Sequence, residues 1–443
     1  MPPVALAAMI ADWLRHPGAA APTEALLDRK AGDFRTLAQR LATPLGDADI
    51  LRLRGEAAGG MAAGRLAEAD KALAQAELRA IGGSTDLSTL PLERRLLIGE
   101  NRADRAALSF LRTTSDGYRE AAARYGEASA LIGLANIDLS RAAALNQAKA
   151  LARISEDFGG RDGYDAAIAA LRRLIEGLDS LADTVAFAGA QEALASALEG
   201  LAALTGDAKL VVAALEHCRS GIEYLGREES LPLWRALKLR IGRLAVTLGI
   251  AQKDDELLEE AIATYAGVLA TWNRADDEPR WLEAEHMISR ARATLGRRRS
   301  DLSLLERAFN GLNRVSMATE RTRDPLRWAE LQDQMGRVLA AMGERYSEPV
   351  VLEEAIAAFA LAMEERRQDG HPLLWARSLA NQAEAMLQLA RRNKDKDLAQ
   401  KALAQLMTAT ETARRSAAGE ALAADLQKRL VAAGETATRL IGG

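Results

Sequence analysis

The chain has 443 residues and a formal net charge of −4, with acidic and basic residues interspersed. Because it has no long basic tract, the sequence argues against nucleic acid or an anionic membrane surface as a partner. Hydrophobic residues make up 49% and aromatic residues only 4%, which favours helices packed through small side chains over sheets. The length fits two or three globular domains or one repeat array.

The sequence also gives expectations about the cellular compartment of the protein. Cys218 is the single cysteine, so no disulfide can form within the chain and nothing indicates an oxidising compartment. The first 22 residues lack the basic start and the long apolar core of a signal peptide. No apolar run approaches the roughly 18 residues of a membrane span. We therefore expect a cytoplasmic protein without a membrane span.

Residues 1–90 are less regular than the rest of the chain. A breaker at His16-Pro17-Gly18 separates two predicted helices, and Thr23 is the expected N-cap of the second. A further helix pair and a glycine-rich boundary are predicted at 51–58, 64–73 and 82–84. We expect residues 1–90 to form an N-terminal helical cap with one weak repeat-like unit. Their apolar faces lack repeat partners on one side, which makes them a candidate homodimerisation element.

A period of 47 residues begins near residue 91. Both tryptophan and alanine recur at this interval, at Trp234, Trp281, Trp328, Trp375 and at Ala167, Ala214, Ala261, Ala308, Ala355, Ala402. Each unit predicts two helices that are apolar on one face, so the units must stack to bury these faces. The sequence therefore predicts an all-α fold, an α-solenoid of stacked antiparallel helix pairs. About seven pairs are expected over 91–418, followed by a capping helix over 419–443.

Residue types within a unit explain where its helices begin and how they pack. Proline at the first helical position, as at Pro325, has a φ that already suits a helix, and Asp324 before it suits the positive helix start. The tryptophan three residues after Pro325 has a fixed place, which favours packing between units over a stacking platform for a ligand. In the second helix, small alanines are followed four residues later by the larger Tyr265, Leu312, Phe359 and Leu406.

These residues resemble the tetratricopeptide repeat family in a long-period form. Trp328-Ala329-Glu330-Leu331-Gln332-Asp333-Gln334-Met335-Gly336 is similar to the first helix of that motif, and 352–359 is similar to the second. The resemblance covers about 91–416, and 46–80 more weakly. It departs from the usual period of about 34 residues, and Ser289 and Ala383 stand where Gly336 is expected. The resemblance implies a bacterial protein with a right-handed superhelix and a concave groove for a partner segment.

In that family, the groove is lined by first-helix positions two, five, nine and twelve residues after the tryptophan. Carried over, these positions place Arg243, Arg290 and Arg337 in one row. The other candidate groove residues are His286, Asp333, Gln334, Arg377, Asn381 and Glu384. The row could clamp carboxylates bidentately, which implies a protein or peptide partner that is acidic or offers its C-terminus. Alternatively, each arginine pairs with a neighbouring Glu283, Glu330 or Asp333 and only solvates the groove.

Patterns of catalytic and metal-binding residues are missing from the sequence. The four histidines lack metal-ligand spacing, and adjacent acids such as Glu259-Glu260 diverge by about 100° on a helix. The glycines of 55–64 miss both phosphate-loop patterns. Cys218 falls in a core position, and His217 beside it is expected to face solvent. We therefore predict a non-enzymatic protein-interaction scaffold with no cofactor and no metal. The alternative is a regulatory protein whose superhelix responds to a bound ligand or peptide.

Overall fold

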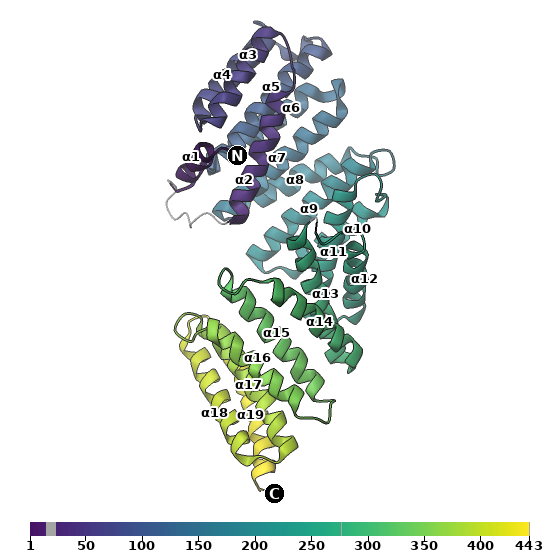
Figure 1. Ribbon diagram of the computed structural model, residues 1–443. Coiled ribbons are helices and arrows are strands. Elements are labelled where there is room, and N and C mark those ends of the chain that lie inside the picture. Colours follow the sequence, from purple (N-terminus) through teal and green to yellow (C-terminus); the bar gives the residue numbers. More distant parts are fainter. Residues whose placement is uncertain (15–23, 276, 443) are drawn as a thin grey trace. The chain divides into compact units, whose positions relative to one another are not determined.

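The computed structural model describes residues 1–14, 24–275 and 277–442 (Figure 1). Within these ranges every regular element is helical, and the helices number nineteen α-helices and two short 3-10 helices. The predicted all-α solenoid is therefore confirmed. His16-Pro17-Gly18 and Thr23, predicted as a breaker and an N-cap, lie outside the described residues. None of the described helices is long and apolar enough to span a membrane.

The chain forms two compact units, residues 1–237 and 238–443, and the dividing point lies within helix α11 (Leu231–Gln252). The first unit contains α1 (Pro3–Leu14), α2 (Glu24–Ala42), α3 (Ala48–Ala62), α4 (Leu66–Ile81), η1 (Leu87–Thr89), α5 (Leu92–Leu111), α6 (Ser115–Ile132), η2 (Gly133–Ala135), α7 (Ile137–Phe158), α8 (Asp162–Glu176), α9 (Thr184–Thr205) and α10 (Ala208–Glu223). The second unit continues with α12 (Asp255–Leu269), α13 (Glu278–Arg299), α14 (Leu302–Ala318), α15 (Pro325–Gly343), α16 (Val350–Glu365), α17 (Pro372–Asn393), α18 (Lys396–Arg415) and α19 (Glu420–Gly442).

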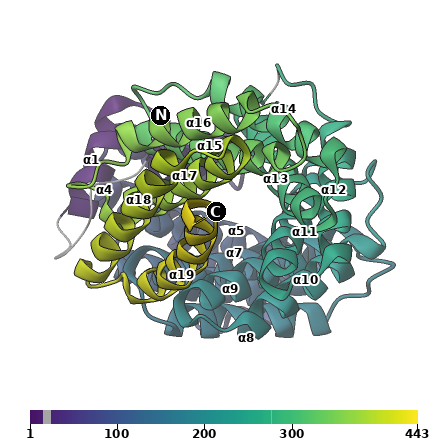
Figure 2. The ribbon, with the colours of Figure 1, turned by 90° about the horizontal axis from the view of Figure 1, so that it is seen from below.

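Within each unit, from α3 onward, the helices pack in consecutive pairs. Figure 2 shows α9 beside α10 in the first unit and α17 beside α18 in the second. The first helices of successive pairs also touch one another, as α7 does with α9, α13 with α15, α15 with α17, and α17 with α19. The first helices therefore form a common layer within each unit, which is the layer where the predicted groove residues lie.

Aspartates fix the starts of many repeat helices. Asp254, Asp301 and Asp395 each accept a hydrogen bond from a backbone N–H in the first turn of α12, α14 and α18. Asp277 and Asp324 cap α13 and α15 in the same way. These caps satisfy N–H groups that have no partner within the helix. Within each set the aspartates stand at multiples of the 47-residue period, so the start of each helix is encoded locally.

Glycine and aromatic side chains meet where the two helices of a pair cross. A Cβ atom added at Gly336 would lie 2.8 Å from the Phe359 ring, and one added at Gly242 would lie 2.6 Å from the Tyr265 ring. Both distances are too short for a side chain to fit without a shift of the ring. In the two units that carry leucine instead of an aromatic residue, the first helix carries a larger residue, with Ser289 before Leu312 and Ala383 before Leu406.

The repeated tryptophans are partly buried at the starts of first helices. The guanidinium of Arg321 lies 4.3 Å from the ring centre of Trp328, and that of Arg274 lies 5.1 Å from the ring centre of Trp281. Trp375 packs against the core formed by α17, α18 and α19. Because a guanidinium already covers two of these rings, their arrangement fits packing better than an open stacking platform.

Helix α2 lies across the repeats of the first unit. Its Phe34 and Leu37 share a core with Met61 of α3 and Leu108 of α5, and α2 contacts both helices (Figure 1). The buried Lys30 of α2 also holds this position, because its ammonium donates to a backbone carbonyl of α5 and covers two aromatic rings. The N-terminal segment is thus integrated into the repeat packing of its unit.

Candidate functional site

The predicted groove residues all lie on the first helices of the second unit, and many of them bond to one another. The contacts join residues 41 to 48 positions apart, so most connect equivalent turns of neighbouring first helices. We call the residues that these contacts join the polar ladder. It consists of Glu283, His286, Arg327, Asp333, Gln334, Ser378, Asn381, Glu384 and Arg429.

The ladder begins with His286 on α13, which is 2% exposed. Its Nδ1 lies 2.9 Å from a guanidinium nitrogen of Arg327, and its Nε2 lies 3.0 Å from Oε1 of Gln334. Burial, and next the charge of Arg327, lower the pKa of His286 to about 4. The ring is therefore neutral at pH 7. Since a guanidinium can only donate, Nδ1 accepts and the proton sits on Nε2, which donates to Gln334. Arg327 also pairs with Glu283 at 2.9 Å.

The middle of the ladder is the carboxylate of Asp333 on α15, which is 2% exposed. Its Oδ1 accepts hydrogen bonds from the Ser378 hydroxyl at 2.8 Å and from the Asn381 amide at 3.3 Å. Two guanidiniums also lie near this carboxylate, with Arg337 Nε 3.2 Å from Oδ2 and Arg366 Nη1 3.7 Å from Oδ1. The Arg337 nitrogen is buried but does not reach hydrogen-bond geometry. Oδ1 of Asp333 thus takes its hydrogen bonds from α17 and Oδ2 faces Arg337, whose other nitrogens form no hydrogen bond with a described residue.

The ladder ends at Arg429 on α19. Its Nε donates to Glu384 at 2.6 Å and its Nη2 donates to the carbonyl oxygen of Asn381 at 3.0 Å. Buried polar groups need such partners, because leaving one unpaired costs about 1–3 kcal/mol. A ligand could use His286, Gln334 or Asp333 only by breaking contacts that hold neighbouring helices together.

The remaining predicted arginines, Arg290, Arg377 and Arg243, lie outside the polar ladder. Arg290 donates to the sulfur of Met287 at 3.5 Å and forms no ion pair with a described residue. Arg377 is exposed and has no hydrogen bond or ion pair within the described part of the chain. Arg243 is exposed as well. Arg243, Arg290 and Arg337, the predicted row, therefore lie in three different environments.

One cleft of about 280 Å³ lies beside the ladder, and we call it the Arg297 cleft. It brings together three predicted residues, Arg337, Asn381 and Glu384, and does not include the other six. It also holds residues that the sequence reasoning missed, namely Arg297, Glu344, Arg345 and Gln388. Glu344 accepts from Gln388 at 3.0 Å, and Glu384 is paired with Arg429, so both carboxylates of the cleft are already engaged.

Arg297 is the notable cation of this cleft. It is exposed, and it forms no hydrogen bond or ion pair with any residue that the structure describes. It lies sixteen residues after Trp281, beyond the four groove positions carried over from the family. In the sequence it is one of three arginines that end α13, where positive charge ordinarily serves the helix end. Only the fold shows that this arginine lines a cleft with Arg337.

The two residues in the middle of α10 differ in their surroundings. Cys218 is fully buried, as predicted. The expectation that His217 faces solvent is wrong, because its Nδ1 lies 2.7 Å from Oε1 of Gln191 on α9 and the ring is partly buried. Burial, and next the charge of Arg172, lower the pKa of His217. Among the residues that the structure describes, no group of three or more histidine, cysteine or acidic side chains could hold a metal ion.

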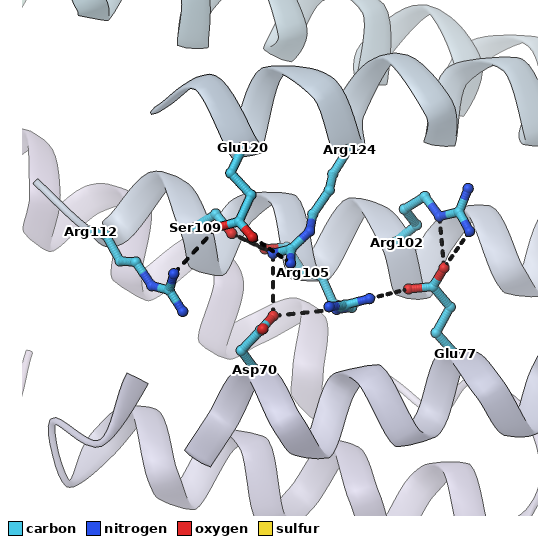
Figure 3. Close-up of polar contacts among 8 residues, drawn as sticks. All are labelled: Asp70, Glu77, Arg102, Arg105, Ser109, Arg112, Glu120 and Arg124. Atoms are coloured by element: carbon cyan, nitrogen blue, oxygen red, sulfur yellow. Dashed lines mark hydrogen bonds and ion pairs between the residues drawn. The ribbon is translucent and has the colours of Figure 1, made fainter. Parts of the chain in front are cut away.

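The first unit has its own polar network, which joins α4, α5 and α6 (Figure 3). Arg105 bonds to both Glu77 and Asp70, and Arg124 bonds to Asp70 and Glu120. Figure 3 shows the same acids reached by the two outer arginines, Arg102 at Glu77 and Arg112 at Glu120. Every arginine of this network has a carboxylate partner. It therefore links three helices and leaves no cation free for a ligand.

Comparison with known proteins finds similarity among solved structures. No protein-family model matches the chain, and no curated protein matches it. Among solved structures, the chain is similar to a circular tandem repeat protein with novel repeat topology and enhanced subunit contact surfaces. The identity is 16%, the match covers 93% of this chain and 98% of that chain, and the TM-score is 0.28. The assignment of a helical repeat fold therefore rests on the helix packing described above.

Proposed function

We propose that this protein is a non-enzymatic interaction scaffold that binds the C-terminus or an acidic stretch of a protein partner in the Arg297 cleft. We further propose that it is a cytoplasmic bacterial protein of the long-period tetratricopeptide-like type. Stacked helix pairs with a layer of first helices, as in the second unit, suit extended partner segments. The 47-residue period and the tryptophan and proline positions support the family assignment.

The observation that carries the proposal is the pair of guanidiniums in the cleft. Arg297 has no partner among the described residues, and Arg337 keeps donors beyond its contact with Asp333. The carboxylates of the cleft already have partners. Planar guanidiniums match carboxylate oxygens in geometry and charge, and hydrogen bonds to a charged group contribute about 1.5–3 kcal/mol. A peptide carboxylate would supply a negatively charged acceptor for these two guanidiniums.

The test begins with partners that co-purify from the native host and are identified by mass spectrometry. Peptides from their C-termini are then labelled, and binding is measured by fluorescence anisotropy with a free or an amidated C-terminus. We expect Arg297→Ala with Arg337→Ala to weaken the free peptide about 10- to 100-fold. If the partner is bound by its C-terminus, the amidated peptide should bind weakly even to the wild-type protein. If it is bound by an internal acidic stretch, amidation should leave the affinity unchanged.

A matched control is Arg391→Ala, which removes an exposed arginine of α17 outside the cleft and the ladder. This variant should bind like the wild type. Equal affinity of the wild type and the Arg297/Arg337 variant for every acidic or free-carboxylate peptide would rule out the cleft as the binding site.

A second candidate function is ligand-responsive regulation. It is favoured by a separate cleft of about 400 Å³ in the first unit, one wall of which is helix α2. A ligand bound there would change how firmly α2 is held. Ligand-dependent thermal stabilisation with altered hydrogen exchange in α2 would distinguish this function from a passive scaffold.

A further inference from the structure

The cleft of the first unit lies between α2 and the helices α7 and α9, above α5, α6 and α8. Its apolar lining comes mainly from Leu37, Phe110, Tyr125 and Leu171. A volume of about 400 Å³ falls within the range of ligand pockets. At about 30 Å³ per water molecule it equals roughly 13 waters, which is similar in atom number to one large amino acid.

The charged residues of this cleft balance in number. Arg40, Lys149 and Arg153 provide the positive charges, and Asp33, Glu156 and Glu192 provide the negative ones. A cleft with this balance gives little net attraction to a strongly charged ligand. It suits a ligand that is neutral overall but carries a separated positive and negative charge.

Most of these charged groups are already engaged. Arg40 pairs with the buried Asp104 at 2.6 Å, and Arg153 pairs with Glu156. Two groups differ, because neither Asp33 nor Lys149 forms a hydrogen bond or an ion pair with a residue that the structure describes. Asp33 is partly buried, and this burial raises its pKa, although the nearby charge of Lys30 acts in the opposite direction. Asp33 is thus a partly buried carboxylate that has no hydrogen-bond or ion-pair partner among the described residues.

We propose that this cleft binds a free amino acid with a large apolar side chain. Its ammonium would pair with Asp33, its carboxylate with Lys149, and its side chain would rest on Phe110, Tyr125 and Leu171. A simple anion would leave Asp33 unpaired and would be repelled by it. A simple cation would gain nothing from Lys149, which is exposed and positively charged. The proposal does not depend on the Arg297 cleft.

The site would also couple the ligand to helix α2. Asp33, Thr36, Leu37 and Arg40 all belong to α2, and the rest of the lining belongs to α5 through α9. A ligand that contacts both sides therefore stabilises the docked position of α2. Binding of this kind is visible as slower amide hydrogen exchange in α2, in addition to any heat of binding.

The decisive experiment uses the full chain and isothermal titration calorimetry with four probes. These are L-phenylalanine, L-leucine, N-acetyl-L-phenylalanine, which lacks the ammonium, and L-phenylalanine amide, which lacks the carboxylate. We expect one or both free amino acids to bind at millimolar or lower concentration. Each blocked derivative of phenylalanine should bind at least about 10-fold more weakly, since each loses one ion pair. These arms need no variant, so they do not depend on the folding of a mutant.

Two substitutions then assign the two charges. Asp33→Asn should weaken the free amino acid and the amide but leave the acetyl derivative unchanged. Lys149→Met should weaken the free amino acid and the acetyl derivative but leave the amide unchanged. Asp28→Asn on α2 and Lys71→Met on α4 are matched controls, because both residues are exposed and lie outside the cleft. Absence of binding by both free amino acids would overturn the proposal. So would blocked derivatives that bind as tightly as free phenylalanine, or control variants that lose as much affinity as Asp33→Asn and Lys149→Met.

Discussion

At single residues, size is matched across each helix pair of the second unit. Gly336 sits beneath Phe359 and Gly242 beneath Tyr265, while serine or alanine stands at the equivalent place where the partner is leucine. In the sequence, Ser289 and Ala383 read as departures from the repeat motif. In the fold they are explained by volume, because cores tolerate substitutions that conserve the total volume.

This matching predicts opposite effects for two glycine substitutions. Gly336→Ala should destabilise the protein by about 1–3 kcal/mol, because its Cβ would meet the Phe359 ring at 2.8 Å. Gly267→Ala in α12 should stabilise it by roughly 0.5–1 kcal/mol, since nothing lies within 4 Å of the added atom. Adding Phe359→Leu to Gly336→Ala should recover part of the loss. Urea unfolding of the four proteins measures these differences, and a stabilising Gly336→Ala would refute the explanation.

A second residue-scale prediction concerns Lys30, which is 4% exposed. Burial lowers its pKa to about 8 from its ordinary 10.5, so between these values the unfolded chain binds more protons and stability rises with pH. Below pH 8 both states are protonated, and the burial penalty of on the order of 3 kcal/mol is present in full. Contacts with Phe110 and Tyr118 offset part of it.

Lys30→Met should therefore stabilise the protein at pH 7 by about 1–2 kcal/mol, less than the full penalty because those contacts are lost too. The difference in the free energy of unfolding between variant and wild type should shrink as the pH rises above 8. Denaturant unfolding at several pH values measures the gap, and comparing the two proteins cancels the titration of other groups. A gap that stays constant with pH would mean that the pKa of Lys30 is the same in the folded and the unfolded chain.

At the level of helices, the sequence predicts local features well. Helices α15 and α17 begin at Pro325 and Pro372 as predicted, because proline and the apolar spacing act within the helix itself. The sequence reasoning missed the position of α2, the cleft beside Arg297 and the partner of His217. Each of these depends on contacts between helices distant in sequence, which no local pattern records. The binding role of the nine predicted groove residues remains a prediction.

The last helix, α19, supplies a prediction at this scale. Leu426 is fully buried against α17 and α18, and Arg429 bonds to α17. Leu426→Ala should cost about 2–5 kcal/mol and loosen α19 first, because only one repeat holds it. Hydrogen exchange should speed up in α19 and the adjacent α18 and remain unchanged in α13. Uniform acceleration across the second unit would show that the helices open together.

For the whole molecule, repeat stacking predicts unfolding in more than one step, because each pair depends mainly on its neighbours. The tryptophans are unevenly placed, with Trp272, Trp281, Trp328 and Trp375 in the second unit and only Trp13 and Trp234 in the first. Fluorescence therefore reports chiefly on residues 238–443, whereas circular dichroism reports on all helices. We expect the two urea transitions to have different midpoints. Coincident curves would indicate one cooperative transition.

The polar ladder has a consequence for how such a chain can change in length. The size matches lie inside a helix pair, whereas the ladder bonds run between pairs one period apart. Removing residues 325–371 would delete the Gly336–Phe359 match as a whole and leave the other size matches intact. It would also bring Asn381 to the place of Gln334, so His286 would still face an amide. Leu374 would replace Arg327, however, and leave Nδ1 of His286 and the carboxylate of Glu283 without their donor. Whole repeats can therefore be gained or lost as units. Each such event changes only the polar contacts between the two helix pairs that become neighbours.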